Sequence, residues 1–434
     1  MQHSLMEKVK MFYFIVIGTM MYYFLTEIIN LGVFVSFRHA FALVLAASAV
    51  ALFLYRPNIA RGVESVKSAL LYSAPLLVTI LASLFIWFTE QVDTNVIARG
   101  LSGAFIYTNM LSFSLAAVAF LYTFGEKGIW YNLTAVLAAN ILMIGTIILE
   151  YGMGSYFSEL IALITSFAAE TGDIIVQAEV HELAFCLGAY LIYMLLKPKK
   201  NIVFYILLAL TLFCFLSAFK RIGIIAIVIA LSLGWVLKWI SKFSEKTAFR
   251  LTTIFSILLV VMLVGYIGLI KMDIFTLLEE IGIETSGRVQ IYNAVDKFYE
   301  FSPEFLGNGI GFLTYQLSGE MHVGVSSVHN DFLQYFIDLG FWGYILWLCS
   351  MTVMRIRYFG RNRKTESAII AFVLIVYLLI VSSTDNTMNY PLLTTALAIL
   401  MIGNGFDERV RTTEQSMFGY ISEENREKER DLLL

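Results

Sequence analysis

Residues 202–240 read IVFYILLALTLFCFLSAFKRIGIIAIVIALSLGWVLKWI, two apolar runs separated by Lys220 and Arg221. A bilayer core about 30 Å thick needs roughly 20 apolar residues per helix, so each run predicts one membrane span. Lipid offers no partners to backbone polar groups, and a helix satisfies its own. The stretch therefore predicts a helical hairpin whose turn carries the two cations.

The rest of the chain has the same character. Of its 434 residues, 59% are hydrophobic and 15% are charged, and the mean hydropathy is +0.77. Such a composition is too apolar for a soluble fold with a hydrated surface. It predicts an all-α, polytopic transmembrane helical bundle of about 12 spans with a large extracytoplasmic loop. The spans are expected at Phe12–Val35, Ala40–Tyr55, Ser68–Phe88, Leu101–Phe124, Ile129–Leu149, Leu183–Leu196, Ile202–Phe219, Ile222–Ile240, Leu251–Ile270, Phe332–Met354, Ala368–Val381 and Pro391–Ile402.

Neither repeats nor long linkers divide the chain, so residues 1–406 are expected to form one membrane domain. Residues 407–434 are strongly charged and are expected to form a cytoplasmic tail. Lys and Arg concentrate at alternate span ends, which predicts that both termini are cytoplasmic. Two loops, about 150–182 and 271–331, then lie outside. Within the first, Tyr156–Ala169 has the apolar spacing of a helix lying along the membrane surface.

Other classes of feature are not indicated. The net charge of −3 implies no nucleic-acid partner. The three cysteines each stand alone in an apolar run, which suggests neither a disulfide framework nor a metal cluster. The apolar run after Lys10 continues past the length of a signal-peptide core without a clear cleavage site, so it is interpreted as the first span.

Cations on the expected outer face are the first candidate site residues. Lys220 and Arg221 are costly at membrane depth and run against the positive-inside trend, which favours a functional role over a tight turn with two snorkelling side chains. Arg288 follows Ser286 and Gly287 in the second outer loop, where a glycine allows the backbone to approach a ligand. Arginine offers a fixed bidentate fork to phosphate.

Polar residues at two further span ends complete the candidate set. His329 precedes the tenth span and is the residue type best matched to proton transfer near neutral pH. Its neighbour Asn330 suits either sugar hydroxyls or a helix cap. Asp385 and Asn386, between the last two spans, suit orienting a base or a sugar, or simply a polar turn. The glycine-rich turn at 307–311 lacks the Lys-Ser/Thr of a P-loop and indicates conformational freedom only.

No zinc-type spacing or nucleophile elbow accompanies these residues. One histidine and several cations on the outer face suit a substrate with a polyanionic lipid head and a hydroxyl to be deprotonated. The sequence H-N-x9-G-x-x-G, formed by His329, Asn330, Gly340 and Gly343, resembles the signature of the O-antigen ligase and Wzy-type polysaccharide polymerase superfamily. Lys220-Arg221 and Ser286-Gly287-Arg288 are similar to its other two hallmarks. The resemblance covers roughly residues 202–402.

This resemblance implies a GT-C-like membrane glycosyltransferase that uses glycans linked to undecaprenyl diphosphate and needs no metal or other cofactor. By position, Arg221 and Arg288, with Lys220, would bind the diphosphate. His329 would activate the acceptor hydroxyl, with Asn330, Asp385 and Asn386 as sugar or orienting contacts. The cations could stabilise the leaving group without a divalent metal.

The acceptor stays open at this stage. A polymerase transfers to the repeat unit on another carrier lipid and a ligase to the lipid A core, and the Lys-Arg form of the first element favours the polymerase. A transporter or flippase of lipid-linked sugars is a third alternative, although the internal repeats typical of transporters are not evident. The resemblance also implies the bacterial cytoplasmic (inner) membrane, a site facing the periplasm or exterior, and partners that include a chain-length regulator and a flippase.

Overall fold

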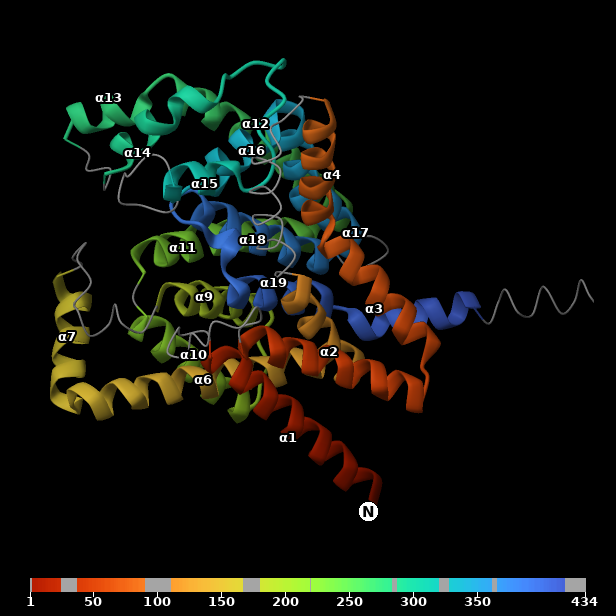
Figure 1. The fold of residues 1–434 in the computed structure, drawn as a ribbon. Helices are drawn as coiled ribbons and strands as arrows, with labels where there is room; N and C mark the ends of the chain where they lie inside the picture. The colour runs from red at the N-terminus through yellow and green to blue at the C-terminus, as the bar shows by residue number, and fades with distance from the viewer. Residues whose placement is uncertain are drawn as a thin grey trace, which may run out of the picture.

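The computed structural model describes residues 2–24, 37–89, 111–166, 180–218, 220–282, 287–319, 328–360 and 365–417. Every regular element in these ranges is a helix (Figure 1), which confirms the predicted all-α class. The principal helices are α1 (Gln2–Tyr23), α2 (Phe37–Tyr55), α3 (Ile59–Tyr72), α4 (Ala74–Thr89), Leu111–Phe124, α6 (Lys127–Tyr151), α7 (Met153–Ser166), α9 (Val180–Leu196), α10 (Ile202–Ser217), α11 (Arg221–Phe243), α12 (Glu245–Lys271), α16 (Asp331–Cys349), α17 (Arg355–Gly360), α18 (Thr365–Ser382) and α19 (Pro391–Gly403). Shorter ones are α13 (Ile274–Glu280), α14 (Arg288–Val295), α15 (Phe312–Gly319) and the 3-10 turns 296–298 and 387–389, and a π-helical turn, 350–354, joins α16 to α17.

Six helices of the described residues are long and apolar enough to cross a membrane, or seven if α3 and α4 form one bent span. The chain is thus a multi-pass membrane protein. Five shorter apolar helices accompany them, so the expected total of about 12 spans stays a prediction. The first helix begins at Gln2, before the predicted start at Phe12, because the residues from Gln2 to Met11 contain neither Pro nor Gly. Residues 25–35 of that predicted span lie outside the described part.

The predicted single span Ser68–Phe88 is two helices, α3 and α4, which meet at an angle of 53°. The break has a local cause at Pro75, whose nitrogen cannot donate to the helix. Ser73 is the C-cap of α3, and its N–H donates to the carbonyls of Ala69 and Leu71. The bend turns α4 toward α16, against which it packs.

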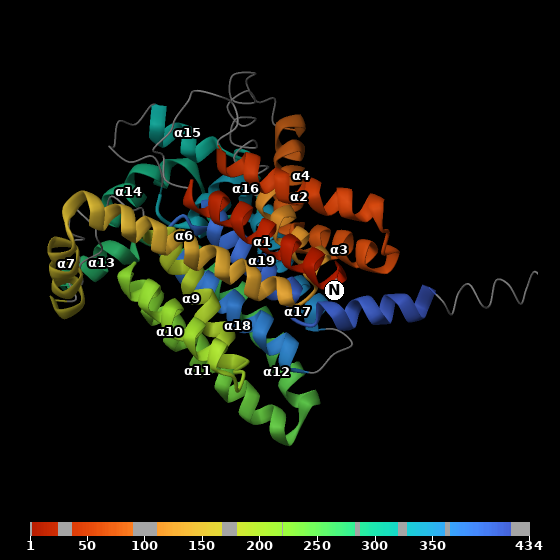
Figure 2. The ribbon, with the colours of Figure 1, turned by 90° about the horizontal axis from the view of Figure 1, so that it is seen from below.

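The core of the bundle is α18. Of its 18-residue window, 83% is buried, so protein rather than lipid surrounds this helix. Helices α9, α11, α12, α17 and α19 contact it. Figure 2 shows α10–α12 on one side of the bundle and α1–α3 on the other. The turn that leads from α18 to α19 is consequently reached by segments from several parts of the chain.

The segment 271–331, which is predicted to be an outer loop, is partly helical in its described residues. Its glycine-rich turn docks on α16 where that helix breaks at Gly340, which has φ 70° and ψ −177°. Carbonyl groups freed by the break accept hydrogen bonds from the turn, from Asn308 N to Ile337 O (3.2 Å) and from Gly309 N to Asp338 O (2.7 Å). The buried Asp338 carboxylate accepts from the N–H groups of residues 311 and 313, each at 3.2 Å. The turn is therefore a docked structural element.

Other predicted features fall partly inside the described residues. The amphipathic segment Tyr156–Ala169 is helical as far as Ser166 within α7, which turns away from α6 after Gly152 (Figure 1). Its place at the membrane surface stays a prediction. Residues 406–417, which include the start of the predicted tail, are helical, and 418–434 lie outside the described part.

Candidate active site

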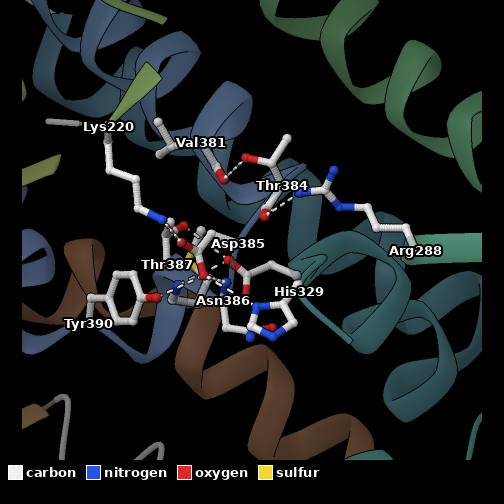
Figure 3. A network of polar contacts seen from close by, with 11 residues as sticks. Lys220, Arg288, His329, Val381, Thr384, Asp385, Asn386, Thr387 and Tyr390 are labelled. Carbon is white, nitrogen blue, oxygen red and sulfur yellow. Dashed lines mark hydrogen bonds and ion pairs between the residues drawn. The ribbon is translucent and has the colours of Figure 1, made fainter. Parts of the chain in front are cut away.

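The candidate residues meet at the turn 383–390, which joins α18 to α19. Lys220 arrives as the N-cap of α11, Arg288 as the first residue of α14, and His329 from the residues directly before α16. Figure 3 shows these three side chains converging on Thr384 and Asp385. Four segments that are far apart in sequence thus form one polar cluster.

Asp385 lies at the centre of this cluster and is 6% exposed. Its Oδ1 accepts hydrogen bonds from Tyr390 Oη (2.7 Å) and from the N–H of Asn386 (2.9 Å). The same oxygen is 3.7 Å from His329 Nδ1, and Oδ2 is 3.8 Å from Lys220 Nζ. Burial raises the pKa of Asp385, but His329, Lys220 and the two donors outweigh it and lower that pKa to about 2. The carboxylate is therefore ionised at neutral pH.

Positive charge is concentrated around Lys220. Burial is the largest cause that lowers the pKa of its ammonium group, and Asp385 opposes the effect. Repulsion from Arg288 and Arg221 lowers that pKa further. One carboxylate thus faces three cations, and an anionic ligand would relieve their mutual repulsion.

Arg288 is held over the turn by its surroundings. Gly287, at φ 74°, occupies the left-handed conformation that begins α14, and this is the backbone freedom for which the glycine is needed. The Arg288 Nη2 group donates to the carbonyl of Thr384 at 3.0 Å. Arg221 begins α11 directly after Lys220, so the two predicted phosphate-binding arginines approach the cluster from different elements.

His329 has a backbone φ of 52°, a left-handed conformation uncommon for residues other than glycine and enriched at functional sites. Its side chain is 48% exposed. Because Nδ1 is directed at the Asp385 carboxylate, Nε2 is the nitrogen available to a substrate. At 3.7 Å the contact is longer than a hydrogen bond, as is common for catalytic pairs without substrate.

Asn330 and Asp331 connect the surrounding elements. The buried Asn330 Oδ1 accepts from the N–H groups of Phe332 and Leu333 and so caps α16, while Nδ2 donates to the hydroxyls of Tyr266 and Tyr292, each at 3.0 Å. These contacts favour the capping role over sugar binding. Tyr292 lies on α14, so Asn330 ties the helix of Arg288 to the residues that present His329.

Asp331 connects the start of α16 to the turn between α18 and α19. It is 1% exposed, and its Oδ2 accepts from Thr387 Oγ1 and from the N–H of Met388, each at 3.0 Å. It thereby fixes the turn that carries Asp385 and the buried Asn386. Sequence reasoning missed Asp331 and the tyrosines 266, 292 and 390. Only the position of Asp331 directly after the His-Asn pair offered a signal.

Comparisons with known proteins bear on the same segments. A family model described as O-antigen ligase matches residues 204–348, a segment that holds Lys220, Arg221, Arg288 and His329 but ends before Asp385. No curated protein matches the chain. In the described residues, no group of three or more His, Cys, Asp or Glu side chains is placed to hold a metal ion. Over residues 204–348 the chain is similar to the O-antigen ligase family, which agrees with the superfamily resemblance that its motifs predicted.

Proposed function

We propose that this protein polymerises oligosaccharide repeat units linked to undecaprenyl diphosphate into a surface polysaccharide such as O-antigen, capsule or exopolysaccharide. The reaction is a glycosyl transfer without a metal on the outer face of the bacterial cytoplasmic membrane. The observation that supports it best is the convergence of Lys220, Arg288 and His329 on the Asp385 turn (Figure 3), inside or next to the family-matched segment.

The cations suit the donor. A lipid diphosphate leaves with growing negative charge, and prearranged donors in a partly buried site stabilise such charge more than water does. Arg221 and Arg288 offer bidentate forks to the two phosphates, and Lys220 adds a point charge between them. Asp385 holds Lys220 in place before the donor binds.

His329 suits the acceptor. Nε2 takes the proton of the acceptor hydroxyl, the freed oxygen forms a bond with the anomeric carbon, and the bond from that carbon to the diphosphate oxygen breaks. Attack from the face opposite the diphosphate inverts the anomeric configuration. The Asp385 carboxylate orients the imidazole and stabilises the imidazolium that forms. Asn386 holds the carboxylate through its backbone N–H.

The alternative is an O-antigen ligase, which uses the same donor and a lipid A core or another acceptor. The description of the matching family model favours it, whereas the Lys-Arg form of residues 220–221 favours the polymerase. A deletion distinguishes the two in cells. A surface lipid capped by a single repeat unit indicates a lost polymerase, and long chains left on the carrier indicate a lost ligase. Single units accumulating on the cytoplasmic side would point to a flippase.

The direct test is transfer in vitro from a defined lipid diphosphate donor, with and without chelator, followed by linkage analysis. We expect His329→Ala to lower the rate about 10²- to 10⁴-fold, the range for loss of a general base. His329→Asn should be equally inactive while preserving the left-handed backbone, because Asn tolerates that conformation. The exposed Lys297 is the control, and Lys297→Ala should transfer at the normal rate. Full transfer by His329→Ala would refute the base assignment, and loss of transfer with chelator would refute the metal-independent reaction.

A further inference from the structure

The end of the bundle opposite the candidate active site contains two adjoining cavities. α19 runs from the active-site turn to Gly403, and the residues after it reach these cavities through Asp407. One cavity of about 810 Å³ lies between the start of α1, the corner from α2 to α3 and the end of Leu111–Phe124. The second, of about 510 Å³, extends to the start of α6. Arg61 and Thr123 line both, so the two form one space, the basic vestibule.

The lining of the basic vestibule is positively charged. Five basic side chains face two carboxylates, a net charge of +3; they are Lys8, Lys10, Arg56, Arg61 and Lys127, against Glu7 and Asp407. The two carboxylates form ion pairs with two of these basic side chains, Lys10 with Glu7 at 2.8 Å and Arg61 with Asp407 at 3.5 Å.

The wall shared by the two cavities also has unsatisfied polar atoms. Arg61 Nε and Thr123 Oγ1 are buried and have no hydrogen-bond partner among the described residues. Arg61 Nη1 is already committed to the carbonyl of Tyr122 at 3.2 Å. Asp407 Oδ1, an acceptor that lines the second cavity, is likewise buried without a hydrogen-bond partner, so it is the excess of basic side chains that favours an anionic ligand.

A third cavity adjoins the vestibule on an exposed apolar surface of the bundle. It measures about 740 Å³, is lined by α2, α3 and Leu111–Phe124, and shares Tyr122 with the vestibule. Its lining is almost wholly aliphatic or aromatic, and Val63, Val66 and Leu70 expose 48%, 60% and 57% of their surface in it. Lys67 is the charged residue among those that line it, and this apolar groove adjoins the positively charged vestibule.

We infer that the basic vestibule and the apolar groove together bind an anionic glycerophospholipid. The phosphate headgroup lies among Lys10, Arg56 and Arg61, where the net positive charge of the lining attracts it, and an acyl chain occupies the groove. Basic pockets between membrane helices bind anionic headgroups in this way. A free phosphate would use the vestibule alone and leave the groove without an occupant. On the expected orientation, the lipid belongs to the cytoplasmic leaflet.

The test is native mass spectrometry of the purified full-length chain in detergent, titrated separately with 1-palmitoyl-2-oleoyl phosphatidylglycerol, its phosphatidylcholine analogue and inorganic phosphate. We expect retained phosphatidylglycerol and at least about tenfold weaker phosphatidylcholine binding. Each cation near an anionic headgroup contributes about fivefold, so Lys10→Gln with Arg56→Gln should weaken phosphatidylglycerol binding about 25-fold.

Matched variants separate the parts of the site. Lys242→Gln with Lys246→Gln removes two exposed cations from the α11–α12 turn and should leave binding unchanged. Val66→Trp fills the groove and should weaken lipid binding at least about tenfold through lost acyl contacts. Unchanged thermal unfolding without lipid shows that each variant is folded. Three results would each overturn the inference. The two lipids could be retained equally, or inorganic phosphate could compete at the lipid's own concentration. The Lys242/Lys246 control could also lose as much phosphatidylglycerol binding as the Lys10/Arg56 variant.

Discussion

Replacing Gly340 with alanine probes the break in α16 on which the glycine-rich turn 307–311 docks. Gly340 has φ 70° and ψ −177°, a region that is essentially restricted to glycine and costs other residues about 1–3 kcal/mol. A Cβ at this position would also overlap the backbone carbonyl of Leu306. Overpacking of that kind costs about 1–3 kcal/mol, so we expect a loss of about 2–6 kcal/mol in the free energy of unfolding.

The expected structural consequence is local release of the turn. The Phe341 N–H donates to Phe305 O at 2.9 Å, and the neighbouring bonds to Asp338 depend on the same register. Thermal unfolding in detergent should therefore shift to lower temperature, and residues 301–319 should become sensitive to protease before the bundle unfolds.

Gly145 on α6 supplies the matched control for this substitution. A Cβ there would meet nothing within 4 Å, so Gly145→Ala should be neutral or stabilise by up to about 1 kcal/mol. A Gly340→Ala protein that unfolds and resists protease as the unmodified protein does would refute the docking argument.

Three further predictions concern the active-site cluster. Asp385→Asn should lower the transfer rate about 10- to 100-fold, because it removes the carboxylate that orients His329. Tyr390→Phe removes one hydrogen bond to that carboxylate and should lower the transfer rate about tenfold or less. Both rates are measured with a defined lipid diphosphate donor. The pKa of Asp385 is lowered to about 2, so its stabilising contacts are fully present above pH about 4 and are lost as the pH falls through about 2. Thermal unfolding over this range should show that loss, and an Asp385→Asn protein with an undiminished acid shift would contradict it. Asn330→Ala should lower the free energy of unfolding by about 1 kcal/mol, because α16 loses its N-cap. It should also raise the KM for the donor, because α14, which carries Arg288, loses the hydrogen bond from Asn330 to Tyr292. An unchanged KM would contradict this positioning role of Asn330.

The helices themselves follow from the sequence, because an apolar run of sufficient length has few alternatives in lipid. Residues 202–240 illustrate this, since α10 and α11 begin and end close to the predicted bounds with the cations between them. Breaks inside apolar runs are less visible. Pro75 was a sequence signal for the bend between α3 and α4, whereas Gly340 could not be distinguished from a tolerated helical glycine without the turn that packs against it.

The candidate site shows the same division. The sequence by itself indicated Lys220, Arg221, Arg288 and His329 as candidate site residues, because such residues are costly or unusual at the ends of membrane spans. It suggested Asp385 as a residue that could orient a base, but not that this carboxylate would lie beside both His329 and Lys220, or that Asn330 and Asp331 would connect the surrounding elements. Those roles depend on hydrogen bonds that join α14, the start of α16 and the turn after α18. Contacts over tens to hundreds of residues arise only when the bundle closes, so only the tertiary structure decided them.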